Sequence, residues 1–306
     1  MLRRTILAAA GSATTRRLVS DAPVSRSVVR RFVAGETVED AVQVTRRLVD
    51  AGLSVSLDHL GEDTTEASQA ERAAAAYLAA LERLAEEDLT THAEVSVKLS
   101  AIGLLFDPGT AREHARAICT AADKAGTTVT IDMEDHTTTD AALVAVRDLR
   151  VDFPWLGVVL QAYLRRTEAD CRELAHAGSR VRLCKGAYRE PESVAFQDKH
   201  DVDRSYVRCL NVLMGGHGYP MIATHDPRLI AIADDRAKWY DRPRRSYEYQ
   251  MLYGIRPDEQ IRLAAEGETV RVYVPFGDEW YAYLMRRLAE RPANVAFFLR
   301  SLASTK

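Results

Sequence analysis

The sequence has few of the patterns that mark several common protein classes. Its apolar runs are too short for a transmembrane helix, and a net charge of −3 with no long basic tract argues against a nucleic-acid partner. No Gly-x-Gly-x-x-Gly run follows a strand-like segment, which argues against a nicotinamide cofactor. The cysteines lack metal-ligand spacing, so we expect no metal and a reduced, cytoplasmic protein: they are Cys119, Cys171, Cys184 and Cys209.

Apolar residues alternate with polar ones in several strand-like segments. Four of these segments each carry one chemically useful polar residue, namely Lys98, Asp132, Arg182 and Tyr273. Because successive side chains of a strand point to opposite faces, each segment has one apolar face and one face equipped for charge. An antiparallel sheet with one solvated face would also give this pattern.

Segments with helical spacing separate the strand-like ones. They are Thr65–Glu87, Thr110–Ala125, Thr139–Arg150, Thr167–Ala177, Asp203–Met214, Asp226–Trp239 and Asp258–Glu266. Strands that alternate with helices favour a parallel sheet, and in a closed barrel the apolar strand faces meet the helices while the polar faces point inward. The inward charges must then have a role or a partner, because an unpaired charge held away from water is very costly.

Eight segments are strand candidates, which is the number that closes a (β/α)8 barrel. They are Leu53–Leu57, Val95–Leu99, Val129–Met133, Gly157–Ala162, Arg180–Cys184, Met221–Thr224, Tyr247–Leu252 and Val270–Val274. A chain of 306 residues can hold one barrel of about 250 residues plus an extension. We therefore predict the α/β class, with a TIM-like (β/α)8 barrel and C-terminal helix over residues 53–306 and a helical arm over residues 1–52.

In this fold the catalytic groups lie at the C-terminal ends of the strands. The polar residues expected there are Lys98, Asp132, Gln161, Lys185 and His225. The segment Arg182–Pro191 could hold a phosphate or an electron-rich ring with its backbone N–H groups and cations, or be a strand followed by a solvated turn. His225 could be a structural histidine or a ligand contact, and its position at a strand end favours contact.

A second group of polar residues follows the last strand. Tyr283, Arg286, Arg287 and Glu290 are spaced three and four apart, so they can share one helix face. Glu290 can brace an arginine, and paired guanidinium groups are suited to binding a carboxylate. A solvated basic face would give the same pattern, but the closeness of the pair to the last strand favours carboxylate binding.

Several of these segments together resemble the monofunctional bacterial proline dehydrogenases. The matching segments are Val97–Ser100, Asp132–Glu134, Leu160–Tyr163, Arg182–Pro191, Ala223–His225, Glu248–Gly254 and Tyr273–Glu290. The Lys-Gly-Ala-Tyr run and the later Tyr…Arg-Arg…Glu run, in this order, are specific together. The sequence departs from the family at Asp226, where Asn is frequent, and at Tyr249, where Phe is frequent.

The resemblance implies a distorted barrel that holds FAD noncovalently and oxidises L-proline to Δ1-pyrroline-5-carboxylate. It implies that Lys98, Arg286 and Arg287 bind the proline carboxylate, next to Glu290. Tyr273, Leu252 and Tyr283 would wall the pyrrolidine ring, and Asp132 and Arg182 would lie nearest the reacting centre. The residues that would hold FAD are Met133, Gln161, Arg182, Lys185, Gly186, Ala187, Thr224 and His225.

The resemblance also implies partners. Electrons would pass from the flavin to a quinone, and a separate pyrroline-5-carboxylate dehydrogenase would take the product. No membrane-docking surface is evident in the sequence, so we expect a cytoplasmic protein with at most peripheral contact at the inner face of the membrane. Two alternatives stay open: a Schiff-base aldolase that uses Lys98 or Lys185 beside Asp132, and a non-catalytic barrel that only binds an amino acid.

Overall fold

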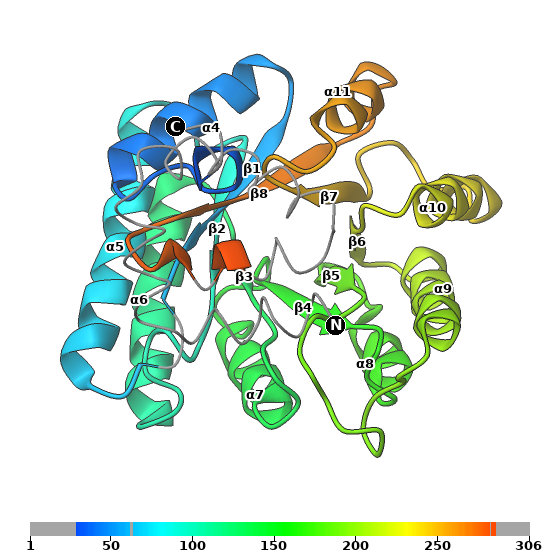
Figure 1. The fold of residues 1–306 in the computed structure, drawn as a ribbon, viewed down its shortest axis with the longest axis horizontal. Helices are drawn as coiled ribbons and strands as arrows, with labels where there is room; N and C mark the ends of the chain where they lie inside the picture. Colours follow the sequence, from blue (N-terminus) through cyan, green and yellow to red (C-terminus); the bar gives the residue numbers. More distant parts are fainter. Residues whose placement is uncertain (1–28, 62–63, 282, 286–306) are drawn as a thin grey trace, which may run out of the picture.

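The computed structural model describes residues 29–61, 64–281 and 283–285. Within these residues, eight parallel strands close into one barrel in the order β1 to β8 (Figure 1). The strands are β1 (Ser54–His59), β2 (Ala93–Val97), β3 (Val129–Ile131), β4 (Gly157–Gln161), β5 (Arg180–Cys184), β6 (Tyr219–Ala223), β7 (Glu248–Leu252) and β8 (Val270–Phe276). The predicted (β/α)8 barrel is confirmed.

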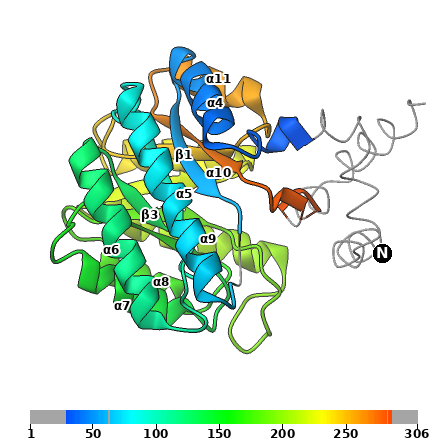
Figure 2. The ribbon, with the colours of Figure 1, turned by 90° about the vertical axis from the view of Figure 1, so that its left-hand side faces the viewer.

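Helices surround the barrel (Figure 1). Helix α4 (Val38–Asp50) precedes β1, and the helices between successive strands are α5 (Ala67–Glu86), α6 (Pro108–Ala125), α7 (Thr139–Leu149), α8 (Thr167–Leu174), α9 (Lys199–Gly215), α10 (Pro227–Trp239) and α11 (Pro257–Ala265). Helices α4, α5 and α6 pack in a row on one flank (Figure 2). Among the described helices, none is long and apolar enough to cross a membrane.

The division of the chain at residue 52 into an arm and a barrel stays a prediction.

Local sequence signals set the helix ends. In α4, the Thr37 hydroxyl accepts a hydrogen bond from the N–H of Asp40 at 3.1 Å, and the Asp40 carboxylate accepts one from the N–H of Thr37 at 3.2 Å. Helix α6 begins after Asp107, whose carboxylate accepts a hydrogen bond from the N–H of Gly109. The helix ends at Ala125 and is capped by Gly126, whose backbone is in the left-handed region. Such ends fix where the chain turns back toward the next strand.

The strands are apolar on one face and polar on the other. Val55 and Val97 are fully buried in the apolar core that the strands share with the helices, and each such side chain contributes about 1.5–3 kcal/mol of burial free energy. The alternate residues Ser56 and Ser96 point into the barrel, where both hydroxyls contact the guanidinium of Arg182. The polar faces therefore look inward, as predicted.

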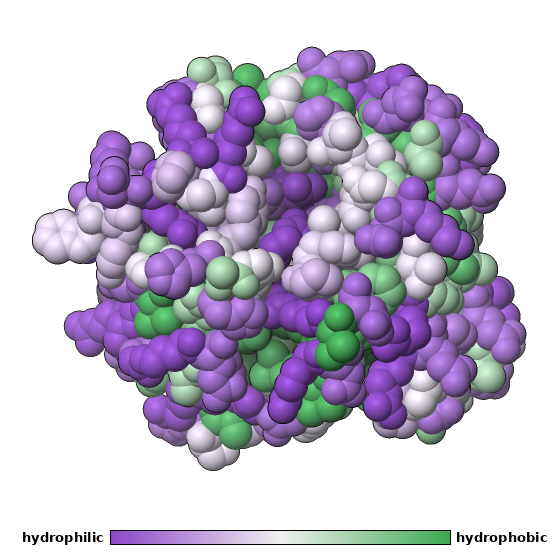
Figure 3. Space-filling model, turned by 180° about the vertical axis from the view of Figure 1, so that it is seen from behind, coloured by the Kyte–Doolittle hydropathy of each residue, from purple (hydrophilic) through white to green (hydrophobic). Residues whose placement is uncertain are grey.

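Buried ion pairs close the barrel at the end where the strands begin. Glu94 accepts a hydrogen bond from Arg180 at 2.8 Å, and Glu248 accepts one from Arg271 at 2.8 Å. Burial raises the pKa of Glu94, but the guanidinium groups of Arg180 and Arg271 outweigh it and hold that pKa below its usual range. We call these four residues the base network. A hollow of about 250 Å³ lies over them. On the face opposite that of Figure 1, hydrophilic residues line a depression at the centre (Figure 3).

Several strands end at different residues from those predicted. Strand β1 continues to His59 because it pairs with β8 along its whole length. Strands β2 and β3 end at Val97 and Ile131, which form the last pair of their ladder. Lys98 and Asp132 therefore lie just beyond their strands rather than inside them, where the chain is already turning.

Helix α9 begins earlier than predicted. It starts at Lys199 rather than at Asp203, because the side chain of Asp198 accepts a hydrogen bond from the N–H of His200 at 2.8 Å and caps the helix. The loop from β5 to α9 consequently spans residues 185–198. This loop carries the Lys-Gly-Ala-Tyr run to the mouth of the barrel.

Candidate active site

A cavity of about 830 Å³ opens at the C-terminal ends of the strands. Its lining includes all the predicted site residues within the described part of the chain: Lys98, Asp132, Met133, Gln161, Arg182, Lys185, Gly186, Ala187, Thr224, His225, Leu252, Tyr273 and Tyr283. Arg286, Arg287 and Glu290 lie outside the described residues. Residues from seven strand ends or the loops after them thus share one cavity, as expected at the C-terminal face of a (β/α)8 barrel.

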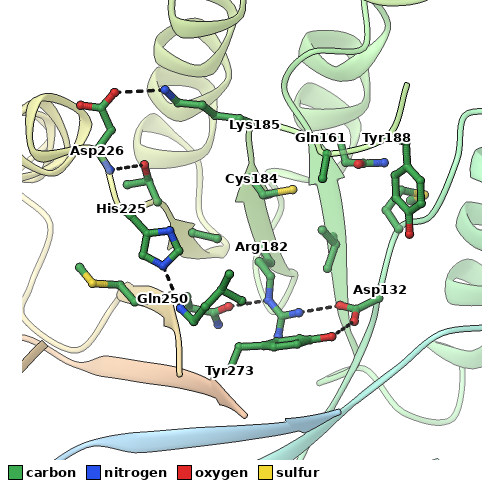
Figure 4. Close-up of a pocket in the computed structure, with 18 of the residues that line it drawn as sticks. Asp132, Gln161, Arg182, Cys184, Lys185, Tyr188, His225, Asp226, Gln250 and Tyr273 are labelled. Carbon is green, nitrogen blue, oxygen red and sulfur yellow. Dashed lines mark hydrogen bonds and ion pairs between the residues drawn. The ribbon is translucent and has the colours of Figure 1, made fainter. Parts of the chain in front are cut away.

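Arg182 lies at the centre of the cavity floor (Figure 4). Its Nη1 donates hydrogen bonds to Asp132 Oδ1 at 2.6 Å and to Ser96 Oγ at 2.9 Å, and its Nε donates to Gln250 Oε1. The hydroxyl of Tyr273 donates to Asp132 Oδ2 at 2.7 Å. Both carboxylate oxygens of Asp132 are therefore held, one by β5 and the other by β8.

Lys98 forms a buried ion pair that the sequence analysis did not predict. Its Nζ donates to Asp58 Oδ1 at 2.6 Å and lies 3.4 Å from the hydroxyl of Tyr273. Asp58 is fully buried and lines the cavity. The predicted first strand stopped at Leu57 and so left Asp58 out, although alternation from Ser56 would have placed it on the inward face.

We call Asp58, Lys98, Tyr273, Asp132 and Arg182 the mouth network. Burial raises the pKa of Asp58 to about 6, with Lys98 lowering it and Asp132 raising it further. Burial also raises the pKa of Tyr273 well above its usual value, so this hydroxyl stays protonated and remains a donor. The mouth network therefore contains one carboxyl group that changes charge near neutral pH.

The wall beside α10 carries cations. Lys185 pairs with Asp203 of α9 and, at 3.1 Å, with Asp226 (Figure 4). Asp226 also caps α10 by accepting a hydrogen bond from the N–H of Arg228 at 3.1 Å. The side-chain hydrogen bond from Arg228 holds the pKa of Asp226 below its usual range. Lys185 and Arg228 thus both border the cavity, and each forms ion pairs with Asp203 and Asp226.

The loop after β5 passes close to Tyr163. Gly186 has a φ of 104°, and a Cβ at this position would overlap the Tyr163 ring. The Tyr163 hydroxyl also donates a hydrogen bond to Glu190 Oε1, in the same loop, at 3.2 Å. Gly186 is therefore required both by its left-handed backbone and by the ring beneath it.

Two other predicted cofactor contacts are oriented by the backbone of neighbouring elements. The Nε2 of Gln161 donates to the carbonyl oxygen of Glu134 at 2.7 Å. The Nε2 of His225 accepts a hydrogen bond from the N–H of Leu252 at 2.9 Å. His225 therefore has a structural bond to β7 and also lines the cavity, so both interpretations of this histidine have support.

Comparisons with known proteins agree with one another. Residues 41–300 match the family model described as proline dehydrogenase. The chain is 41% identical over 278 residues to proline dehydrogenase 1 of Bacillus subtilis (strain 168), with 91% of each chain covered. It is 38% identical over 281 residues to the proline dehydrogenase of Deinococcus radiodurans, with 90% of each chain covered.

Solved structures show the same barrel. Proline utilization A (PutA) from Bdellovibrio bacteriovorus superposes with a TM-score of 0.80 and 23% sequence identity, over 86% of this chain and 32% of that chain. This chain therefore spans about a third of the PutA chain, and the likeness concerns the fold. The family model and the curated relatives carry the assignment further: this chain belongs to the proline dehydrogenase family, whose members are flavin-dependent enzymes of proline oxidation.

Proposed function

We propose that this chain oxidises L-proline to Δ1-pyrroline-5-carboxylate with FAD as its flavin. Family membership makes it a flavin-dependent proline oxidoreductase of proline catabolism. The choice of FAD and the roles of individual residues are the finer part of the proposal. The observation that carries them is that Lys98, the Asp132–Arg182 pair and Lys185 border one cavity.

The wall formed by the ends of β4, β5 and β6 fits FAD. A cavity of about 830 Å³ is within the usual range for small-molecule and cofactor sites. Lys185, Arg228 and the N-terminus of α10 suit a pyrophosphate. The proposed FAD-binding residues are Met133, Gln161, Arg182, Lys185, Gly186, Ala187, Thr224 and His225. When bound, the flavin supplies the hydride acceptor.

The opposite side of the cavity suits proline. Lys98, with Arg286 and Arg287 from outside the described residues, would bind the carboxylate, and Glu290 would support the arginines. Tyr273, Leu252 and Tyr283 would wall the ring; the side chain of Leu252 packs against the apolar cluster that contains Tyr283. A carboxylate anchor and a ring wall orient the substrate, which raises the rate by fixing the reacting carbon in place.

The side chains at the cavity floor contribute a fixed positive charge and hold one another in place. Arg182 is held by Asp132, Ser96 and Gln250, so its charge has a fixed position and can stabilise negative charge that develops above it. Asp132 in turn fixes the hydroxyl of Tyr273. Because all of these side chains except that of Tyr273 are buried, they exclude bulk water from the reacting centre.

The proposal extends to partners. Electrons would leave the reduced flavin for a quinone, and a separate pyrroline-5-carboxylate dehydrogenase would use the product. Anaerobic turnover with proline and a soluble quinone tests the first point, and loss of signal on omitting the quinone is expected. The second is tested by mixing the enzyme with proline, a soluble quinone, NAD+ and a purified pyrroline-5-carboxylate dehydrogenase, where NADH formation is expected only when both proteins are present.

The visible spectrum of the purified protein tests the main proposal. We expect flavin absorption bands that bleach when L-proline is added without oxygen, because the electrons of the substrate pass to the flavin. In a Lys98→Met variant the bleaching should need far more proline, whereas the exposed control Lys124→Met should behave as the wild type. A protein with bound flavin that proline does not bleach would contradict the proposal.

The aldolase alternative has no support in the comparisons, and the geometry opposes it. A Schiff base needs a neutral amine, but Lys98 and Lys185 are each held in ion pairs with carboxylates. Borohydride treatment in the presence of a carbonyl substrate should therefore leave both lysines unmodified, as peptide mass spectrometry would show.

A further inference from the structure

Asp58 has one carboxylate oxygen that accepts no hydrogen bond within the described part of the chain. Its Oδ1 accepts from Lys98 at 2.6 Å and lies 3.4 Å from the hydroxyl of Tyr77. Its Oδ2 is buried and accepts no hydrogen bond from any residue that the structure describes. A buried carboxylate oxygen normally finds a donor, since leaving it bare costs free energy. The bare oxygen therefore marks a place where a proton would be well accommodated.

The groups around Asp58 hold its pKa close to neutral pH. Lys98 faces it from the end of β2, Asp132 from the end of β3, Tyr273 from β8 and Tyr77 from α5, with the ring of His59 next along the strand. The Tyr273 hydroxyl has a single proton, which it donates to Asp132. Burial and the charge of Asp132 raise the pKa of Asp58, and the charge of Lys98 lowers it, with a net value of about 6.

Substrate binding would raise the pKa of Asp58 and so favour its protonated form. A carboxylate bound by Lys98 faces the carboxylate of Asp58 across one shared ammonium group. When two carboxylates share a site, the pKa of one of them rises strongly. A protein group that gains a proton when an anion binds must take that proton from solvent or from the ligand, and proline brings one on its ammonium nitrogen.

We propose that Asp58 is the proton acceptor of this enzyme, acting through Lys98. The inference rests on the proposed function. As proline binds, an N–H bond of the substrate ammonium breaks and its proton passes to Lys98, while Lys98 gives one of its own protons to the Asp58 carboxylate, where an O–H bond forms. No electrons are gained or lost in this step. It leaves the substrate amine neutral, as its oxidation requires, and leaves Lys98 charged to hold the substrate carboxylate.

The test uses a ligand that cannot supply the proton. Tetrahydrofuran-2-carboxylate has the ring and the carboxylate of proline but no amine, so its binding should draw the proton from solvent. We would titrate it into oxidised holoenzyme between pH 6.5 and 8.5, follow binding by the flavin spectrum, and measure proton uptake with an indicator dye in weak buffer. The variants are Asp58→Asn, Asp58→Glu and, as an exposed control of equal charge change, Asp50→Asn at the end of α4.

The wild type, Asp58→Glu and Asp50→Asn should take up about one proton per ligand bound, and their Kd should rise by up to about tenfold per pH unit across this window. Asp58→Asn cannot accept a proton, so its uptake should vanish and its Kd should not vary with pH. Loss of uptake in Asp58→Asn with recovery in Asp58→Glu supports Asp58 as the acceptor.

Two results would overturn the inference: no proton uptake in the wild type with a pH-independent Kd, or full uptake in Asp58→Asn. If Asp58→Asn does not fold, as judged by its bound flavin and circular dichroism, the wild-type titration alone decides. Either overturning result leaves the proposed function intact as long as proline bleaches the wild-type flavin. Absence of that bleaching is the separate failure that would contradict the proposed function.

Discussion

The two ends of the barrel interior contain the same balance of charge and use it differently. The base network has two carboxylates and two guanidinium groups, and the mouth network has two carboxylates, one guanidinium and one ammonium. At the base, Arg180 and Arg271 lower the pKa of Glu94 despite its burial. At the mouth, burial raises the pKa of Asp58 to about 6 in spite of Lys98.

The difference lies in how well each acid is surrounded by donors. Glu94 accepts hydrogen bonds from Arg180 at 2.8 Å, Thr128 at 2.6 Å and Thr130 at 3.1 Å. Asp58 has an oxygen that no described residue satisfies. Hydrogen bonds to a carboxylate favour its charged form, so Glu94, whose two oxygens both accept, keeps its charge, whereas the bare oxygen of Asp58 can accommodate a proton. At the base the buried atom without a described partner is a donor, Arg180 Nη1. We infer that the base network stabilises the fold and that the mouth network does the chemistry.

Removing the charge of Glu94 should have the largest effect. Glu94→Gln leaves the largely buried guanidinium group of Arg180 without its counter-ion, so we expect the free energy of unfolding at pH 7 to fall by about 3–5 kcal/mol. Urea denaturation followed by circular dichroism measures this. The exposed control Glu192→Gln should change stability by less than about 0.5 kcal/mol. A wild-type unfolding curve for Glu94→Gln would remove the distinction between base and mouth.

The same variant makes a prediction about pH. The pKa of Glu94 is lowered in the folded protein, so its stabilising contribution is complete above the unfolded value of 4.5 and is lost as the pH falls through the folded value. The stability difference between the wild type and Glu94→Gln should therefore be full at pH 7 and smaller near pH 3. A constant difference at both pH values would show that the pKa of Glu94 is not lowered.

Asp132→Asn should affect turnover more than folding. Its side chain keeps its shape but loses the charge that holds Arg182 and the hydroxyl of Tyr273, so we expect kcat to fall by about 100-fold. Steady-state oxidation of proline measures kcat. Urea denaturation checks that the loss of stability is smaller than in Glu94→Gln. Full activity in this variant would remove Asp132 from the proposed site.

Tyr273→Phe should have the smallest effect of the series. It removes the hydroxyl that donates to Asp132 at 2.7 Å and leaves the ring in place. A hydrogen bond to a charged group contributes about 1.5–3 kcal/mol, so kcat/KM for proline should fall by about tenfold or more. Tyr240→Phe, on the surface at the end of α10, is the matched control. Equal kcat/KM values in the two variants would contradict the role of the Tyr273 hydroxyl.

Much of the fold follows from the sequence because the barrel depends on a repeated local pattern. Alternation in segments such as Val129–Met133 and helix signals such as Asp107 with Gly126 specify strands and helices one by one. Eight strand candidates separated by seven helical segments then favour a closed parallel sheet. The strand ends were less accurate, since the last residue of a strand depends on its neighbour in the barrel rather than on its own sequence.

The predicted site residues in the described part of the chain line one cavity, but their pairings were not predicted. Lys98, Asp132 and Arg182 stand out because charged residues interrupt apolar strands. The Lys98–Asp58 pair joins residues 40 positions apart, and Asp58 was missed because the predicted first strand ended at Leu57, two residues before the observed end of β1 at His59. Gln250, which binds Arg182, gives no local signal, because an amide in a strand is equally compatible with a solvent-facing position.

The most decisive experiment is a crystal structure of the holoenzyme with tetrahydrofuran-2-carboxylate. We expect the ligand carboxylate to lie within hydrogen-bond distance of Lys98 Nζ and of the Arg286 and Arg287 guanidinium groups, with its ring between Tyr273 and the flavin. A ligand bound elsewhere, or Lys98 and the two arginines in separate cavities, would contradict this expectation.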